Sequence, residues 1–166
     1  IFALSAIALY ILVRFHNIAF SLGAVVGLVH DVLFILGIYS IFYSIMPFSL
    51  EIDQSFIAAI LTVIGYSINH TVVVFDRMRE NIGLYPKRAL NQLINMSVNS
   101  TLSRTFSTSF STALPLLAMF IFGGETIRGF VFAILLGVIV GTYSTIFIAS
   151  PIAYDIQKKQ AKKAQK

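Results

Sequence analysis

Hydrogen-bonding and ionisable residues interrupt two long apolar stretches of this sequence. His30 and Asp31 lie within the first stretch, and Asn69, His70 and Thr71 lie near the end of the second. A charged residue at the centre of a membrane helix costs roughly 2.5–3.5 kcal/mol on insertion scales, so a sequence that keeps one usually uses it to bond helices together or to move ions. The chemistry that these residues suggest is proton or ion binding.

The expected depths of three ionisable residues are similar. Asp31 follows the start of its apolar stretch at residue 20 by about 11 residues, or roughly 16 Å of helix, which is close to the membrane midplane. His70 precedes the polar residues that end its stretch, and Arg104 enters the next stretch from the same side. We expect Asp31 to be protonated for much of the time, because burial disfavours a bare carboxylate. The three residues could therefore meet inside a helix bundle.

Each polar residue also has a simpler structural explanation. His30 could form a hydrogen bond between helices without titrating, and Asn69 could do the same. Asp76 and Arg77 could be interfacial charges, with the Arg77 side chain extended towards water. Arg104 could equally well anchor its helix at the membrane surface.

The composition indicates a membrane protein. Of the 166 residues, 57% are hydrophobic and only 11% are charged, and the mean hydropathy is +0.86, whereas soluble domains average about 25% charged residues. The net charge of +5 comes from basic residues at helix ends and in the tail, so we expect membrane lipid and no nucleic acid as a partner. Cysteine is absent and the three His residues lack ligand spacing, so we predict no disulfide, no metal site and no cofactor.

Five apolar segments predict an all-α membrane protein with five transmembrane helices, at residues 1–13, 20–46, 54–75, 105–123 and 127–150. Each of the last four can cross a bilayer, but the first is too short, so we interpret the chain as part of a larger protein. We place the transmembrane bundle at 1–154 and a basic cytoplasmic tail at 155–166. Within the bundle, leucines interleaved with Lys87 and Arg88 predict an amphipathic cytoplasmic connection at 77–99.

Positive charge sets the expected orientation. All Lys and Arg residues except Arg128 lie in the loop at 14–19, in the connection at 76–104 or in the tail, whereas the loops at 47–53 and 123–126 carry only acidic charges. The positive-inside rule therefore places the C-terminus in the cytoplasm.

Small and hydroxyl-bearing residues predict how the helices pack. Gly23 and Gly27, like Gly137 and Gly141, have the four-residue spacing that lets helix backbones approach closely in lipid. The stretch 100–112 is rich in Ser and Thr, which suits either a packing face or a hydrated lining.

Several motifs resemble the SecF family of protein-export membrane subunits. Residues 65–80 read GYSINHTVVVFDRMRE, and further similar motifs occur at 30–32, 100–105, 122–129 and 141–154. The resemblance covers nearly the whole chain. It implies a bundle of the resistance–nodulation–division type, to which this chain contributes the last five helices. The first helix, a periplasmic domain and the SecD half, separate or fused upstream, would lie outside it.

The resemblance also implies a function. Members use a proton gradient, or a sodium gradient in some cases, to help the SecYEG channel and SecA export unfolded proteins across the bacterial inner membrane. Such a chain would be an accessory subunit of the translocase rather than an enzyme. The family's ion-coupling centre is an intramembrane Asp followed by Thr-Val-Val, together with the Arg of a Ser-Arg-Thr motif, which correspond here to position 70, Thr71 and Arg104.

Position 70 departs from this pattern because it is His. A buried Asp switches between neutral and negative, whereas a buried His switches between neutral and positive. Its interaction with Arg104 would change from attractive to repulsive, so we hypothesise weakened or rewired coupling with Asp31 as the anionic partner. A small-molecule or lipid exporter, and a purely structural module that holds a SecD-like partner, are the alternatives. An intramembrane enzyme is a remote one, because no nucleophile or metal triad is recognisable.

Overall fold

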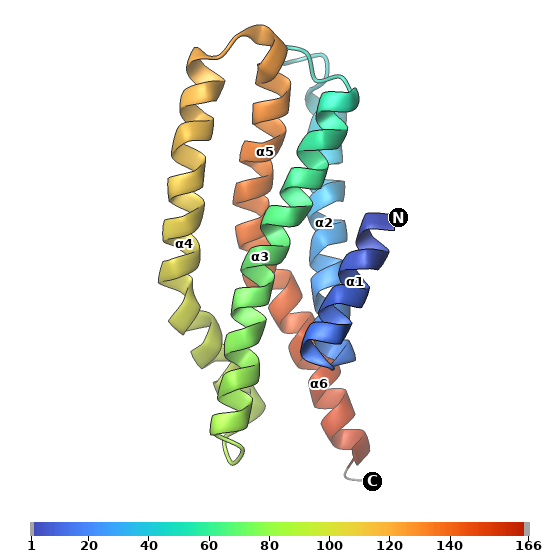
Figure 1. Ribbon diagram of the computed structural model, residues 1–166, viewed down its shortest axis with the longest axis vertical. Coiled ribbons are helices and arrows are strands. Elements are labelled where there is room, and N and C mark those ends of the chain that lie inside the picture. The colour runs from blue at the N-terminus through green and yellow to red at the C-terminus, as the bar shows by residue number, and fades with distance from the viewer. Residues whose placement is uncertain (1, 165–166) are drawn as a thin grey trace.

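A computed structural model describes residues 2–164 of the chain, and its regular elements are all helices (Figure 1). They are α1 (Phe2–Phe15), α2 (Ile18–Phe42), α3 (Gln54–Leu84), α4 (Leu90–Phe122), α5 (Glu125–Ser144), a π-helical turn η1 (Thr145–Ala149) and α6 (Ser150–Ala164). Of the predicted segments, residue 1 and the last two residues of the tail, including Lys166, lie outside the described part. The predicted all-α class is confirmed.

Four helices are long and apolar enough to cross a membrane. They are α2, α3, α4 and the continuous run of α5, η1 and α6 up to Ala161. They match the four full-length spans expected from the sequence. The helix α1 has 14 residues, or about 21 Å, which is shorter than the hydrocarbon core of about 30 Å.

The bundle has an acidic end and a basic end, which are the top and the bottom of Figure 1. The acidic end holds the loops 43–53 and 123–124, and the basic end holds the α1–α2 turn, the α3–α4 turn and α6. With 31 and 33 residues, α3 and α4 are about 46 and 50 Å long, so both exceed the thickness of a bilayer core. Residues 77–99 are divided among the end of α3, a turn and the beginning of α4, and their place on a membrane surface stays a prediction.

Polar side chains cap two of the helices. Asn17 accepts a hydrogen bond from the backbone N–H of Ala19 at the beginning of α2, and Asp53 accepts one from that of Phe56 at the beginning of α3. Each bond satisfies a backbone donor that has no partner within its helix. These caps fix where α2 and α3 begin.

Two apolar clusters form the core, one towards each end. The cluster at the basic end includes Phe15, Phe20 and Phe75, whose rings contact one another, and the cluster at the acidic end is built around Tyr39 and Phe56. Between them, buried polar residues face the interior, and we call these the polar layer: Asp31, Ser67, His70, Thr71, Thr105, Ser144 and Thr145. The folded bundle thus places polar groups where an apolar core would otherwise be continuous.

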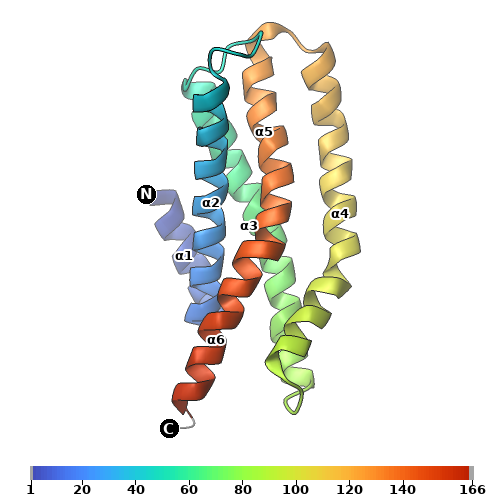
Figure 2. The same cartoon turned by 180° about the vertical axis from the view of Figure 1, so that it is seen from behind.

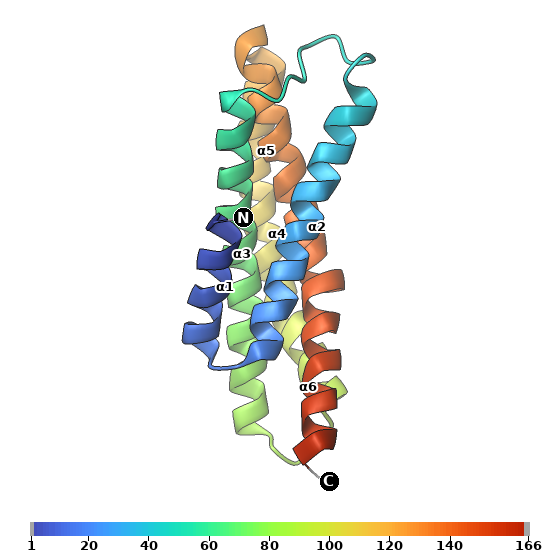
Figure 3. The ribbon, with the colours of Figure 1, turned by 90° about the vertical axis from the view of Figure 1, so that its right-hand side faces the viewer.

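Glycines allow the close helix contacts around the polar layer, as the four-residue spacing predicted. A side chain at Gly137 would overlap Val63 of α3, and a Cβ at Gly141 would lie 3.1 Å from the Ser67 side chain. In α2, a Cβ at Gly23 would lie 2.7 Å from the carbonyl oxygen of Ala149. Figure 3 shows the resulting crossing of α2 over the α5–α6 helix.

The helix α4 lies at one edge of the bundle, as the view from behind shows (Figure 2). Thr101 and Thr105 face inwards, whereas Ser103, Ser107 and Thr108 are exposed. One side of the hydroxyl-rich stretch is therefore a packing face. The other side is uncovered within the described chain.

Candidate functional site

Asp31 is buried, with 1% of its surface exposed, and both of its carboxylate oxygens have a polar neighbour. Ser67 of α3 donates a hydrogen bond from Oγ to Oδ2 over 2.6 Å. His30, the preceding residue, places Nδ1 3.3 Å from Oδ1, and its side chain is about one-third exposed. We call these three residues the Asp31 group.

Hydroxyl contacts link the Asp31 group to the π-helical turn. Thr71 donates to the carbonyl oxygen of Ser67 over 3.1 Å, and its Oγ1 lies 3.0 Å from that of Thr145. Ser150 in turn donates to the Thr145 carbonyl over 2.7 Å, which is the five-residue spacing of a π-helix. A continuous set of polar contacts thus joins α2, α3 and the α5–α6 helix.

His70 is buried with 4% exposure on the side of α3 that faces α4. The Tyr66 ring packs edge-on against its imidazole, with 4.7 Å between the ring centroids. Its Nε2 atom has no hydrogen-bond partner among the described residues. Arg104 of α4 is close enough for its charge to act on the imidazole, although no hydrogen bond joins them.

The register of α3 and α4 places Thr105 opposite His70. Tyr66 donates a hydrogen bond to Ser109 Oγ over 3.4 Å. One helical turn further along α3 lies His70, and one turn back along the antiparallel α4 lies Thr105. Thr105 has 2% exposure, and its hydroxyl, like His70 Nε2, has no partner within residues 2–164. We call His70, Tyr66, Arg104 and Thr105 the His70 group.

The structure brings together only some of the predicted site residues. His70 and Arg104 lie at a similar level on the facing helices α3 and α4, and Thr71 lies one turn from Ser67. Asp31 is held by Ser67 and His30, and no hydrogen bond or ion pair in the described chain joins it to His70 or Arg104. Asn69 is exposed and lies outside the polar layer.

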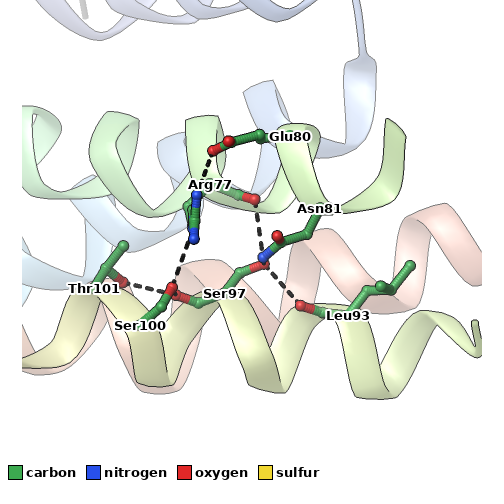
Figure 4. A network of polar contacts seen from close by, with 7 residues as sticks. All are labelled: Arg77, Glu80, Asn81, Leu93, Ser97, Ser100 and Thr101. Carbon is green, nitrogen blue, oxygen red and sulfur yellow. Dashed lines mark hydrogen bonds and ion pairs between the residues drawn. The ribbon is translucent and has the colours of Figure 1, made fainter. Parts of the chain in front are cut away.

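The residues expected at the membrane interface form polar contacts at the basic end. Asp76 accepts a bond from Arg14 of α1 over 3.0 Å. Arg77 pairs with Glu80 over 2.6 Å and donates from Nε to Ser100 of α4 over 3.3 Å (Figure 4). Both charged residues therefore form contacts between helices, and their place at a membrane interface stays a prediction.

Sequence reasoning missed a second polar connection at the basic end. The buried side chain of Asn81 donates a hydrogen bond to Ser97 of α4 over 2.7 Å, and the same hydroxyl lies within hydrogen-bond distance of the carbonyl oxygens of Arg77 and Leu93 (Figure 4). It also missed Ser67, which lies within the quoted motif, and Thr105. A buried Ser or Thr differs from an exposed one only through helix rotation, so the sequence carries no direct signal for these roles.

The geometry suits the binding of single protons better than that of a metal ion. An imidazole and a carboxylate each accept one proton, and each lies buried between helices. Among the described residues, no group of three or more His, Asp or Glu side chains is placed to hold a metal ion. The arrangement can therefore change charge within the bundle without any other ligand.

Comparison with known proteins decides the family. The model of the family described as "Protein export membrane protein SecD/SecF, C-terminal" matches residues 1–159. The chain belongs to this SecD/SecF family. Two curated relatives, both named Protein translocase subunit SecF, are those of Rhodothermus marinus, 52% identical over 96% of this chain, and of Cereibacter sphaeroides, 48% identical over 90%.

Solved SecDF structures share the fold. A crystal structure of SecDF in a super-membrane-facing form superposes with a TM-score of 0.87 and 40% identity over 98% of this chain. SecDF from Thermus thermophilus gives a TM-score of 0.81 and the same identity over 91%. The chain spans about half of the two SecF relatives, 51% and 44%, and about a fifth of the SecDF chains, 21% and 20%.

Proposed function

We propose that this bundle is the membrane part of an accessory subunit that uses the proton gradient to promote translocation of unfolded proteins across the bacterial inner membrane. It would act with a SecD-like partner, the SecYEG channel and SecA, and it would perform no catalysis of its own. The observation that carries the proposal is the burial of His70 beside a cationic Arg104, without a hydrogen-bond partner for Nε2 among the described residues. The names of the relatives support the export role.

The chemistry of the His70 group favours a proton over sodium as the coupling ion. An imidazole binds a proton at a nitrogen atom, whereas hard metal cations need several oxygen ligands. Opposite His70 on α4, Thr105 offers a single hydroxyl oxygen and Arg104 is positively charged, and the latter would repel sodium.

Protonation of His70 would separate α3 from α4. The imidazolium and the Arg104 guanidinium are both positive, and like charges repel strongly where little water screens them. The helix α4 can respond because it lies at the edge of the bundle, next to a mostly apolar groove of about 300 Å³ lined by Phe106, Ser109 and Thr142. Loss of the proton would restore the packing.

The charge distribution supports an orientation with the basic end in the cytoplasm. The exposed side of α4, which carries Phe106, Phe110 and Leu114, would then face a SecD-like partner within the membrane. Such a partner would cover Arg104 and exclude lipid from the His70 group.

Transport in sealed vesicles tests the proposal. We would compare proton-driven export by the assembled translocase with the wild-type chain, His70→Asp and His70→Ala, and use His16→Asn, an exposed histidine at the end of α1, as the control. We expect His70→Ala to lose the response to the gradient and His70→Asp to change its pH dependence, with His16→Asn unaffected. Equal transport by all variants would show that position 70 is not the coupling site and would favour a structural role.

A further inference from the structure

The Asp31 group forms a second polar centre that the His70 group does not include. Among the described residues of the spans, Asp31 carries the one buried carboxylate. Its hydrogen-bonding neighbours belong to α2 and α3, and Gly141 of α5 packs against one of them, Ser67. We propose that Asp31 is a separate proton-binding site and that Ser67 communicates its protonation state to α5. This inference rests on the proposed gradient-driven function.

The hydrogen bonds of Asp31 satisfy only part of a carboxylate. Two oxygens offer about four acceptor positions, and the structure supplies Ser67 and the neighbouring His30 as donors. A charge left partly unsatisfied in a membrane interior is unfavourable. Uptake of a proton therefore removes a charge that the surroundings only partly compensate.

No permanent positive charge contacts Asp31: Arg104 lies at a similar depth, but it is on α4, and no hydrogen bond or ion pair in the described chain joins it to Asp31. The titratable groups that lie near this level on the packed helices are His30 on α2, Tyr66 and His70 on α3, and Tyr143 on α5, which packs near His30. The π-helical turn carries none, and the charged residues of α1, α5 and α6 lie towards the ends of the bundle: Arg14, Glu125, Arg128, Asp155 and the tail lysines. Asp31 thus has no fixed counter-ion that would keep it ionised.

His30 provides a route for the proton. Its side chain is about one-third exposed while Nδ1 faces the Asp31 carboxylate. A protonated His30 can transfer its Nδ1 proton to Oδ1, so that the N–H bond breaks, the O–H bond forms and both side chains become neutral. The proton enters before this transfer, at Nε2 from the exposed side, when neutral His30 carries its hydrogen on Nδ1; the transfer then leaves His30 neutral with its hydrogen on Nε2.

Protonation changes the hydrogen bond that Ser67 makes. Ser67 Oγ donates to Oδ2 of the carboxylate over 2.6 Å. A proton on Oδ1 makes Oδ2 the oxygen of a neutral carboxyl group, which accepts a weaker hydrogen bond than a charged one. The Ser67 hydrogen can then turn to a carbonyl of its own helix. Because Ser67 lies against Gly141, and its carbonyl accepts from Thr71, which contacts Thr145, this rotation acts on the α3–α5 contact and on the π-helical turn.

Infrared difference spectroscopy of the assembled complex in liposomes tests the site independently of transport. We expect a protonated-carboxyl band that appears as the pH falls, that is lost in Asp31→Asn, and that is kept in the control Glu51→Gln, an exposed carboxylate at the acidic end. Ser67→Ala should shift both the band and the pH at which it appears, whereas the exposed Ser40→Ala should not. His30→Gln should slow the appearance of the band after a pH jump.

The outcomes separate this inference from the proposed function. A band that persists in Asp31→Asn, that does not change with pH, or that ignores Ser67→Ala overturns the inference even if export responds to the gradient. If Asp31→Asn does not assemble, the Ser67→Ala shift alone decides. Conversely, a pH-dependent Asp31 band in a complex whose export ignores the gradient would contradict the proposed function and leave the proton site intact.

Discussion

Asp31 and His70 lie near the same level of the bundle, yet their surroundings differ. The Asp31 group is closed by small residues, because Gly141 lets α5 approach Ser67 and the Ser67 hydroxyl reaches the carboxylate. The His70 group opens onto α4 at the bundle edge, where two buried polar atoms have no partner among the described residues and Arg104 is exposed. Tight packing holds the first group in place, whereas the second lies against a helix at the edge of the bundle.

The largest effect should come from disrupting the close contact between α3 and α5 at Gly137. Gly137→Leu places a side chain where Val63 lies, and overpacking of this kind costs about 3 kcal/mol or more when a helix backbone has to move. We expect loss of folded protein in thermal unfolding in detergent. The matched control is Gly65→Leu, whose Cβ meets nothing within 4 Å. If both variants have the same unfolding temperature, close packing of α3 against α5 does not determine the stability of the bundle.

A pair of hydroxyl deletions compares the two groups directly. Ser67→Ala leaves Asp31 with one donor fewer, and an unsatisfied buried polar group costs about 1–3 kcal/mol. Thr105→Val removes a hydroxyl that has no partner within the described residues, so stability should be unchanged or higher. Chemical unfolding curves of the two variants measure this difference. A cost for Thr105→Val equal to that of Ser67→Ala would mean that Thr105 is satisfied in the assembled protein.

Thr105 also offers a functional comparison. If it orients the His70 imidazole, Thr105→Val should shift the pH profile of gradient-driven export, and Thr105→Ser, which keeps the hydroxyl, should restore it. The same shift in both variants would point to packing instead.

A smaller effect is expected where α3 and α4 are already bonded. Ser97→Ala removes the acceptor of the buried Asn81 amide at the basic end, at a cost of about 1 kcal/mol. Ser103→Ala, at an exposed position of the same helix, serves as the control. No difference between the two would show that this network does not anchor α4 at the basic end.

The smallest effect concerns acid sensitivity outside the spans. The Phe56 backbone N–H that donates to Asp53 lowers the pKa of this exposed carboxyl. Its capping contribution is therefore complete above the pKa of the unfolded chain and is lost as the pH falls through the lower folded pKa. We expect Asp53→Asn, which keeps the cap, to remove a slight loss of stability in strong acid. Melting temperatures of both proteins measured against pH would show this difference. If both lose stability equally in acid, protonation of Asp53 is not the cause.

Much of the fold follows from the sequence, because an apolar segment long enough to cross lipid has few options other than a helix. The glycine pairs also indicated close packing correctly. The partners of Asp31 could not be predicted, because Ser67 and Asn69 differ only in the rotation of α3, which tertiary packing sets. The same holds for Thr105, whose neighbours Arg104 and Phe106 are exposed.

The π-helical turn at Thr145–Ala149 determines where the α5–α6 helix can lose a residue. Before it, Gly137 and Gly141 meet α3, and Ala149 at its end and Ala153 after it meet the glycines of α2. A π-helical turn holds one residue more than the α-helical turn it replaces, so deleting one residue from it would restore regular α-helix and leave the downstream residues close to their present faces. The same deletion in the regular helix between Gly141 and the turn would rotate Ala149 and Ala153 by about 100° away from the α2 glycines, so this helix can lose a single residue within the turn more readily than beside it.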